Sequence, residues 1–414
     1  MHPNLSLKTA VSENNSGPNR SSGSGQSTPT IVHITPASAS LTHLLKERIM
    51  LITQKGYRNI GFSTTENIKV NPDQELASIG AEYIESRWLT RRFSLFHDLM
   101  FFFEVMQMTR RLHPDLVITY GPKPGMIARI AAKLAGAETV AHVFWGYIYS
   151  DFDPEFKKKI IRFLEQFSGL FSDVTFTVNE PDRKTINRHW LKRSHAHYLG
   201  NATDVQQRFN PDKIDIEAVE RFRNRHAGSG KIVITLIGRT IRTKGYEEFI
   251  AAAKHLLSKR NDLVFWMAGP RDDIRGTAIS LDSIEQEQAE GKILYLGSVP
   301  VEDMALLNAA SDIICLPSWR EGFPRSLVEA AAMAKPLIAT DINGCREVVK
   351  HQHNGLLVPL RDPEALSQAI ERLADDQATR IQMGANSRKL AVEHFDQKQL
   401  VNRMLSVLET SLNH

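Results

Sequence analysis

The sequence predicts an α/β protein with two doubly wound parallel-sheet domains that face each other across a cleft. Short apolar segments alternate with longer amphipathic ones along most of the chain, which is typical of repeated β-α-β units. The alternation comes in two sets, separated by a break at Gly228-Ser229-Gly230. A chain of 414 residues also has the length of about two domains.

The first set of alternating segments begins at Ile31. Apolar, β-branched runs between polar residues indicate buried strands, and apolar residues spaced three and four apart indicate helices. The expected strands are residues 31–34, 60–62, 115–119, 139–144 and 174–178, and the expected helices are residues 40–53 and 125–134.

The second set follows the glycine break and has the same character. The expected strands are residues 231–238, 263–269, 293–297, 312–316 and 336–340, with a helix over residues 246–257. Parallel strands present their carboxyl ends at one edge of a sheet, and ligands of such folds bind there. We therefore expect the ligand site in the cleft between the two domains.

The domain boundaries follow from changes in composition. Residues 1–30 are rich in Ser, Asn, Gly and Pro and lack the apolar segment of a signal peptide, which predicts a disordered tail. Residues 31–200 form the first domain, 201–230 a linker and 231–390 the second domain. Residues 391–414 are expected to form a helix that packs back on the first domain.

Composition excludes several classes of protein. There are 51 Lys and Arg against 47 Asp and Glu, and a net charge of +4 is too small to indicate nucleic-acid binding. Cys315 and Cys345 make no disulfide framework, which favours a cytoplasmic protein. No run of 18 apolar residues is present, so we expect no transmembrane helix.

Two glutamates, Glu321 and Glu329, give the clearest functional signal. Glu321 falls in the loop after the strand 312–316, and Glu329 falls in the first turns of an Ala-rich helix. The start of a helix binds anions, because its unpaired amides and its dipole are positive. Two acids beside such an anion site suit a ligand that carries both phosphate and hydroxyl groups, such as a nucleotide-sugar.

A second loop, residues 238–245, leaves the first strand of the second domain. It carries Arg239 and Lys244 between Gly238 and Gly245. Arginine can bind a diphosphate through two hydrogen bonds, and lysine adds a point charge. These two cations lie at the edge of the sheet where the ligand is expected.

These motifs resemble those of the retaining glycosyltransferases of family 4. The resemblance rests on residues 238–245, 321–330, 340–349 and 354–359, and it covers nearly all of residues 31–405. It implies the GT-B fold, with an acceptor-side first domain and a nucleotide-sugar-binding second domain. In the first domain, residues 119–129 and 178–183 are similar to enzymes that build bacterial capsule, O-antigen or exopolysaccharide.

The resemblance also implies roles for individual residues. Glu329 would accept hydrogen bonds from the ribose, Glu321 would face hydroxyls of the donor sugar, and Arg239 and Lys244 would neutralise the leaving diphosphate. No metal ion or other cofactor is then needed. The remaining donor-binding residues would be Gly238, Gly322, Phe323, Pro324, Arg325, Ser326 and Leu327, with the amides of residues 323–327 holding the sugar and distal phosphate.

The sequence departs from the family in two places. Where family members often have a histidine before a glycine, this chain has Trp145-Gly146, and Trp145 is expected either to contact the sugar or to be a core aromatic. The nearby His142 is expected in the strand core. The loop of residues 35–40 lacks the usual double glycine, which leaves its acceptor contacts undefined.

The resemblance further implies a nucleoside-diphosphate sugar donor, with uridine as the expected base, and a lipid-linked saccharide acceptor. Basic and large apolar or aromatic residues are mixed in segments 87–93 and 156–164, and the first of these segments directly precedes the apolar stretch 95–108. Such surfaces suit an anionic lipid interface. We therefore expect a cytoplasmic protein that is peripheral at the inner membrane face.

Two other functions stay open from the sequence. A UDP-sugar 2-epimerase shares the two-domain architecture but would need further acids and a histidine around the sugar. A non-catalytic nucleotide-sugar-binding subunit is favoured only by Trp145. The pairs His195-x-His197 and His351-x-His353 have metal-like spacing but no companion ligands in a known pattern, so no metal site is predicted.

Overall fold

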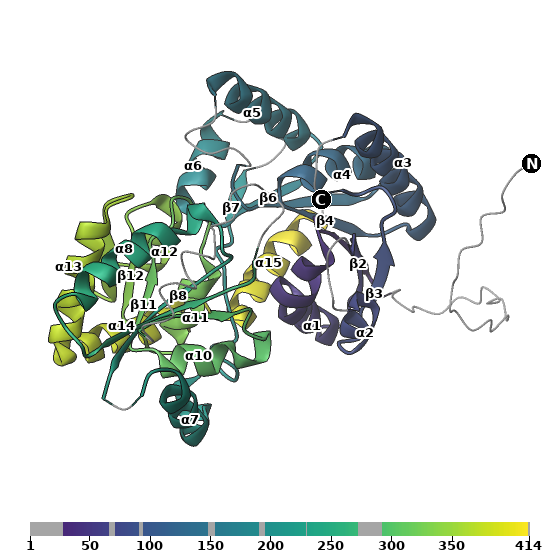
Figure 1. Ribbon diagram of the computed structural model, residues 1–414. Coiled ribbons are helices and arrows are strands. Elements are labelled where there is room, and N and C mark those ends of the chain that lie inside the picture. Colours follow the sequence, from purple (N-terminus) through teal and green to yellow (C-terminus); the bar gives the residue numbers. More distant parts are fainter. Residues whose placement is uncertain are drawn as a thin grey trace, which may run out of the picture.

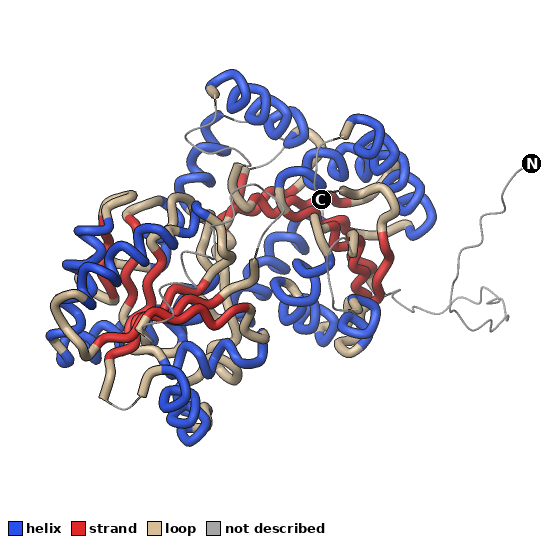
Figure 2. The backbone as a smooth tube through the Cα atoms, viewed as in Figure 1, coloured by secondary structure: helices blue, strands red, loops and turns tan. Residues whose placement is uncertain are grey.

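A computed structural model describes residues 28–65, 71–90, 94–147, 154–189, 195–228, 230–271 and 292–412. Most of the predicted tail, residues 1–27, and part of the basic segment, residues 91–93, lie outside the described residues. The described chain forms two lobes, each with a central sheet flanked by helices (Figures 1 and 2). The predicted fold class is confirmed.

The first lobe is built on a parallel sheet with the strand order β3-β2-β1-β4-β5-β6-β7. Its strands are β1 (Thr30–Ile34), β2 (Arg58–Ser63), β3 (Glu82–Glu85), β4 (Leu116–Tyr120), β5 (Thr139–Phe144), β6 (Val174–Thr177) and β7 (Ala196–Tyr198). Its helices are the π-helical turn η1 (Ser40–Leu44), α1 (Lys46–Gln54), α2 (Pro72–Ala77), α3 (Leu95–Leu112), α4 (Pro122–Leu134), α5 (Glu155–Gly169) and α6 (Glu180–His189). The inner strands β1, β4 and β5 are buried along their whole length because helices cover both faces of the sheet.

The second lobe has a parallel sheet with the order β10-β9-β8-β11-β12-β13. Its strands are β8 (Ile232–Ile237), β9 (Leu263–Ala268), β10 (Ile293–Gly297), β11 (Ile313–Leu316), β12 (Leu337–Thr340) and β13 (Gly355–Val358). Its helices are η3 (Arg242–Lys244), α8 (Tyr246–Leu257), η5 (Val301–Asp303), α10 (Met304–Ala310), α11 (Arg325–Ala332), α12 (Asn343–Val348), α13 (Pro363–Asp375) and α14 (Gln377–His394).

Each sheet has a point where the strand order reverses, between β1 and β4 in the first and between β8 and β11 in the second. Ligands of open α/β sheets bind beyond the carboxyl ends of the strands at such points. The loops that follow β8 and β11 are the two that carry Lys244 and Glu321. The topology therefore brings the predicted site residues to one edge of the second sheet.

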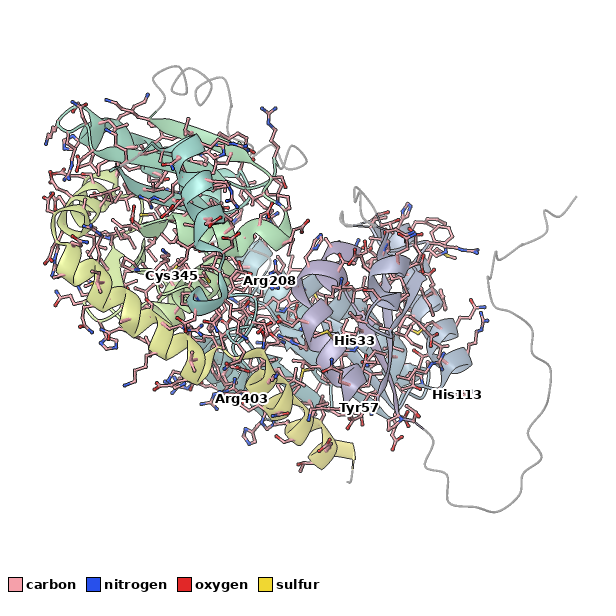
Figure 3. The ribbon with its side chains drawn as sticks, turned by 90° about the horizontal axis from the view of Figure 1, so that it is seen from below. His33, Tyr57, His113, Arg208, Cys345 and Arg403 are labelled. Atoms are coloured by element: carbon pink, nitrogen blue, oxygen red, sulfur yellow. The ribbon has the colours of Figure 1, made fainter. Side chains whose placement is uncertain are left out.

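One hydrophobic core joins the two lobes. It includes Leu116 of the first sheet, Ile314 of the second and Met404 of the final helix α15 (Gln397–Leu412), and all three are almost fully buried. Helix α15 leaves the second lobe and runs alongside α1 in the first, where Tyr57 donates a hydrogen bond to Glu409 of α15 at 2.9 Å; Figure 3 labels Tyr57 and, on α15, Arg403. The two lobes therefore share buried apolar surface, which favours their association.

Two predicted segments differ from the structure. The predicted linker, residues 201–230, contains the short turn η2 (Pro211–Lys213) and the helix α7 (Ile216–His226), which Asp215 caps through the amide of Ala218 at 3.2 Å. The predicted helix over residues 391–414 is broken, because α14 ends at His394 and α15 begins at Gln397. Asp396 causes the break by accepting hydrogen bonds from the first amides of α15.

Three strands were missing from the prediction: β3, β7 and β13. Each lies at an edge of its sheet. The sequences of β3 (Glu-Tyr-Ile-Glu) and β7 (Ala-His-Tyr) lack the apolar run of a strand that is buried on both faces.

A buried ion pair fixes helix α5 against α4. Arg129 of α4 donates from Nη2 to Glu165 of α5 at 2.6 Å, and both side chains are fully buried. Arg129 also donates to the carbonyl of Gly125, and Ser168 of α5 donates to the carbonyl of Met126. The face of α5 that meets the domain is therefore largely polar.

We expect Arg129→Met to destabilise the first lobe by about 3–5 kcal/mol, because it leaves the Glu165 carboxylate buried without a partner. The double variant Arg129→Met/Glu165→Leu should recover most of this loss, since it removes both charges. Urea unfolding curves would measure both changes. Equal unfolding midpoints for the single and the double variant would contradict the prediction.

Candidate active site

The loop after β8 forms the first wall of the candidate site. Gly238 lies half-buried at the start of this loop, and its carbonyl accepts a hydrogen bond from the Tyr246 hydroxyl at 2.6 Å. Gly245 ends η3 at φ +76° and lies against the carbonyl of Pro317, where a side chain would collide with the backbone. Arg239 is exposed on this loop. The loop is therefore held in place at both of its ends.

The loop after β11 forms the second wall. The amide of Trp319 donates to the carbonyl of Thr243 at 2.9 Å, which ties the two walls together. Lys244 Nζ lies 2.5 Å from Glu321 Oε1, and the side chains are 19% and 10% exposed. Two predicted site residues that are far apart in the sequence thus form an ion pair at the carboxyl edge of the sheet.

Helix α11 brings the second glutamate to the same place. Glu329 lies one turn into this helix, is 8% exposed, and accepts a hydrogen bond from Arg325 Nε at 2.8 Å. The amides of Leu327 and Val328 both return to the carbonyl of Pro324. Within the described part of the chain, no acceptor is recorded for the amides of Arg325 and Ser326, as expected at a helix start.

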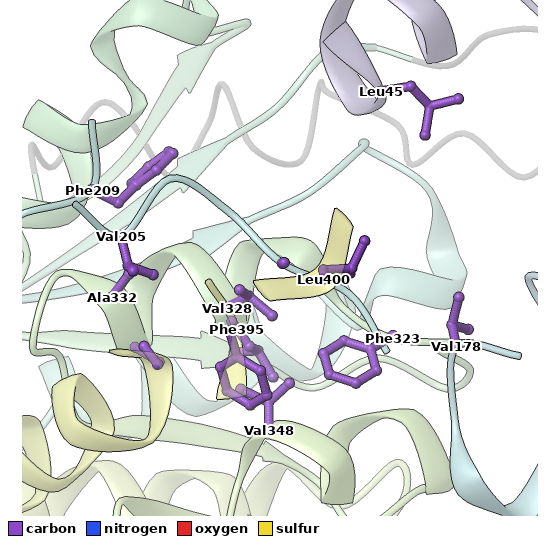
Figure 4. Close-up of a cluster of buried hydrophobic side chains, with 14 of the residues drawn as sticks. Leu45, Val178, Val205, Phe209, Phe323, Val328, Ala332, Val348, Phe395 and Leu400 are labelled. Atoms are coloured by element: carbon purple, nitrogen blue, oxygen red, sulfur yellow. The ribbon is translucent and has the colours of Figure 1, made fainter. Parts of the chain in front are cut away.

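The remaining predicted donor residues lie in the turn before α11. Phe323 and Pro324 are buried, and Gly322 and Ser326 are half-buried. Figure 4 shows Phe323 beside Phe395, which directly follows α14, and their ring centroids are 5.7 Å apart at an angle of 84°. The turn is thus packed against the point where the chain returns to the first lobe.

Trp145, which follows β5, provides the opposing wall from the first lobe. Its carbonyl oxygen lies so close to Gly322 that a Cβ there would be 2.5 Å away. Its half-buried ring packs on Gly121 and lies 5.8 Å from the ring of Tyr120. The ring of Trp145 is packed within the first lobe while its carbonyl faces the second lobe, and contact with the donor sugar stays a prediction.

His142 is a core residue, as expected. It is fully buried, and its ring lies 2.9 Å from the Thr119 hydroxyl and directly beneath Gly125. Burial lowers the pKa of this imidazole well below its ordinary value, and the nearby Arg129 lowers it further. A neutral, enclosed imidazole does not reach the cleft.

No functional role was expected for Asn179, which joins the two lobes at the turn before α11. Its Nδ2 donates to the carbonyl of Gly322 at 3.2 Å, while its Oδ1 accepts from the amide of Asp182 at 2.8 Å. Glu347 of α12 accepts from the amide of Glu180 at 2.9 Å. The helix-capping pattern of Asn179 is readable in the sequence, but its contact with the other lobe is not.

The described residues contain no group of three or more His, Cys, Asp or Glu side chains placed to hold a metal ion. Both cysteines are buried. Burial raises the pKa of the Cys345 thiol well above its ordinary value, and nearby Glu321 adds to this effect. A protonated, enclosed thiol is a poor nucleophile.

Two family models match the chain. Residues 218–390 match the glycosyl transferases group 1 model, and residues 51–202 match the glycosyl transferase 4-like domain model. Together these matches span most of both lobes. The second lobe therefore contains the group 1 glycosyl transferase domain, and the first lobe contains the glycosyl transferase 4-like domain.

Several curated relatives are similar over most of their length. One, from Campylobacter jejuni, is an N,N'-diacetylbacillosaminyl-diphospho-undecaprenol alpha-1,3-N-acetylgalactosaminyltransferase, 26% identical over 81% of this chain and 88% of the relative. Another, from Escherichia coli, is a UDP-Gal:alpha-D-GlcNAc-diphosphoundecaprenol alpha-1,3-galactosyltransferase, also 26% identical, over 76% and 80%. The capsular polysaccharide glycosyltransferase CapM of Staphylococcus aureus is 22% identical over 92% and 97%.

Solved structures support the fold. A Rickettsia africae glycosyltransferase has a TM-score of 0.75 at 19% identity, covering 94% of this chain and 99% of its own. Anabaena HepE in complex with UDP has a TM-score of 0.74 at 16% identity, covering 92% and 100%. The protein is a glycosyltransferase with the GT-B fold, and the retaining mode expected from the sequence fits family 4.

We expect Gly322→Ala to lower the rate of sugar transfer at least tenfold, because the new methyl group would push the Trp145 carbonyl away and misalign the two walls. Steady-state kinetics would measure the loss. Gly384→Ala is the matched control, since Gly384 is equally crowded but by the Ala334 carbonyl within the second lobe. Gly384→Ala should lower the melting temperature without changing turnover per folded molecule. If Gly322→Ala and Gly384→Ala had similar turnover, the prediction would be contradicted.

Proposed function

We propose that the protein transfers a hexose-type sugar from a UDP-sugar to a lipid-linked saccharide, with retention at the anomeric carbon, during synthesis of a cell-surface polysaccharide. The observation that carries the proposal is the convergence of the Lys244–Glu321 and Arg325–Glu329 pairs at the start of α11, opposite Trp145. The names of the Campylobacter and Escherichia relatives support a diphosphoundecaprenol-linked acceptor. These relatives favour transfer over epimerisation.

The donor is assigned to the second lobe. Glu329 accepts hydrogen bonds from the ribose, Glu321 binds hydroxyls of the sugar, and Arg239 with Lys244 neutralises the diphosphate. Lys244 and Glu321 already form an ion pair, so the ligand binds to two side chains that hold each other in position. One such preorganised group contributes about 3 kcal/mol to transition-state stabilisation, or roughly a hundredfold in rate.

The reaction breaks the bond between the anomeric carbon and the diphosphate oxygen and forms a new bond to an acceptor hydroxyl on the same face. The hydroxyl proton passes to the leaving phosphate oxygen. Arg239, Lys244 and the amides at the start of α11 stabilise the negative charge that develops on the diphosphate. The proposed reaction needs no metal ion, since these groups supply the positive charge.

The donor site can be tested with a panel of UDP- and GDP-sugars. The melting temperature of the protein would be measured with each of them, once with Mg²⁺ and once with a chelator. The correct donor at 100 times its dissociation constant should add about 2.7 kcal/mol of stability without metal. Arg239→Ala should abolish the shift. Arg242→Ala is the control, because Arg242 lies on the same loop but pairs with Glu247.

Two results of this titration would overturn the donor assignment. Either no donor stabilises the wild type, or stabilisation requires the metal ion. Slow hydrolysis of the bound donor that is lost in Glu321→Ala would separate an enzyme from a non-catalytic binding subunit.

A surface on the first lobe supports membrane contact. Helices α3, α4 and α5 pack side by side at one end of this lobe (Figure 1). Large apolar side chains on α3 and α5 are 42–93% exposed. We call these residues the apolar patch: Leu95, Phe96, Leu99 and Phe103 of α3, with Phe156, Ile160, Phe163, Leu164 and Phe167 of α5.

Helix α5 turns several polar side chains inward and most of its large apolar side chains outward, with Ile161 as the buried exception. Lys158, Glu165 and Ser168 are buried against the lobe, while Phe163 is 62% exposed. Lys157, Lys159 and Arg162 lie among the apolar residues on the exposed side. An amphipathic helix with cations beside a broad apolar face suits a bilayer that contains anionic lipid.

We therefore propose that the protein is peripheral at the inner face of the cytoplasmic membrane, where the lipid-linked acceptor would be found. No described helix is both long and apolar enough to cross a bilayer.

We expect Phe163→Ser/Phe167→Ser to weaken binding to vesicles with about one-third anionic lipid by at least tenfold, because each buried phenyl ring contributes on the order of 2 kcal/mol. Sedimentation with vesicles would measure the loss. Ile216→Ser is the matched control, since Ile216 is 69% exposed but lies on α7, outside the apolar patch. Equal losses in the two variants, or no vesicle binding by the wild type, would contradict the assignment.

A further inference from the structure

Arg325 is the first residue of α11, and its guanidinium bonds to both lobes. Its Nε donates to Glu329 Oε1 at 2.8 Å within α11. Its Nη1 donates to the carbonyls of His43 at 2.9 Å and Leu44 at 3.1 Å, where η1 ends in the first lobe. One side chain thus connects the glutamate of the donor site to the opposing domain.

The geometry of this connection is specific to arginine. A guanidinium is planar and directs its N–H groups in fixed directions, so the bond from Nε to Glu329 also sets the direction of Nη1. A lysine has one nitrogen and cannot reproduce this fork. Among the described residues no partner is recorded for Glu329 Oε2, so Arg325 holds one carboxylate oxygen and leaves the other for a ligand.

The surroundings make these bonds stronger than those of an exposed ion pair. The side chains of Arg325 and Glu329 are 17% and 10% exposed, and Arg208 lies nearby at the boundary of the lobes (Figure 3). Burial and Asp204 raise the pKa of Glu47 on α1 to about 7, while Arg325 acts against this shift. Attraction between charges is greater where water is largely excluded.

We propose that Arg325 is a positioning residue that couples donor binding to closure of the two domains. It aligns Glu329 for the ribose and anchors the start of α11 to the end of η1 with the same guanidinium. A nucleotide that binds Glu329 then also favours the closed arrangement, since a ligand shifts an equilibrium by its different affinities for the two states. This inference rests on the proposed donor site.

The experiment compares wild type, Arg325→Ala, Arg325→Lys and Glu329→Gln. Calorimetry would give the affinity for UDP, and small-angle X-ray scattering would give the radius of gyration with and without UDP. Arg388→Ala is the matched control, because Arg388 also bonds two backbone carbonyls, those of Phe209 and Ala332, without contacting Glu329. Melting temperatures would confirm that each variant is folded, and Arg325→Gln would replace a variant that is not.

We expect Arg325→Ala and Arg325→Lys to weaken UDP binding about tenfold, as for loss of a charged hydrogen bond, and to give a larger radius with and without UDP. Glu329→Gln should weaken UDP binding yet keep the compact radius of the free wild type, because Arg325 still reaches η1. Arg388→Ala should change neither quantity.

Two results would overturn the proposal for Arg325. In one, Arg325→Ala weakens UDP binding but is as compact as the wild type, which would make Arg325 a local donor contact only. In the other, its affinity and radius match those of Arg388→Ala. If the wild type binds no UDP, the donor assignment fails separately, and the radius of free Arg325→Ala still decides whether Arg325 holds the lobes together.

Discussion

The chain passes from the first lobe to the second near Thr203 and returns near residues 395–397. The contact between these two crossing segments is the constraint on which the rest of the structure depends. Thr203, on the outward crossing, accepts from the amide of Gln397 at 3.1 Å and donates its own amide to Phe395 at 2.9 Å on the return crossing. Asp396 lies between these two bonds and starts α15. Because both crossings are tied at one point, the carboxyl edges of the two sheets are held facing each other.

The same point reaches the candidate active site directly. Phe395 packs against Phe323, and Nδ2 of the Asn201 side chain donates to the Phe323 carbonyl at 3.4 Å. The turn before α11 therefore touches the crossing on one side and the first lobe, through Asn179 and Trp145, on the other. The residues proposed to bind the donor alternate along one short segment with residues that join the domains.

The first lobe combines a rigid interior with an apolar exterior. The Arg129–Glu165 pair costs desolvation energy that an apolar pair of the same size would not, so it is not an efficient source of stability. It does determine which side of α5 faces the lobe. The α5 part of the apolar patch is thus turned outward by a polar contact in the interior.

The sequence by itself determined the two parallel sheets and the pair of glutamates, because strands buried on both faces need continuous apolar runs and a helix start has a local signature. It did not determine that Arg325 bonds to the carbonyls of His43 and Leu44. Every residue carries a carbonyl, so such a partner leaves no trace in the sequence. The amphipathic pattern of α5 likewise defines two faces without saying which is buried, and only the tertiary contact between Arg129 and Glu165 decided it.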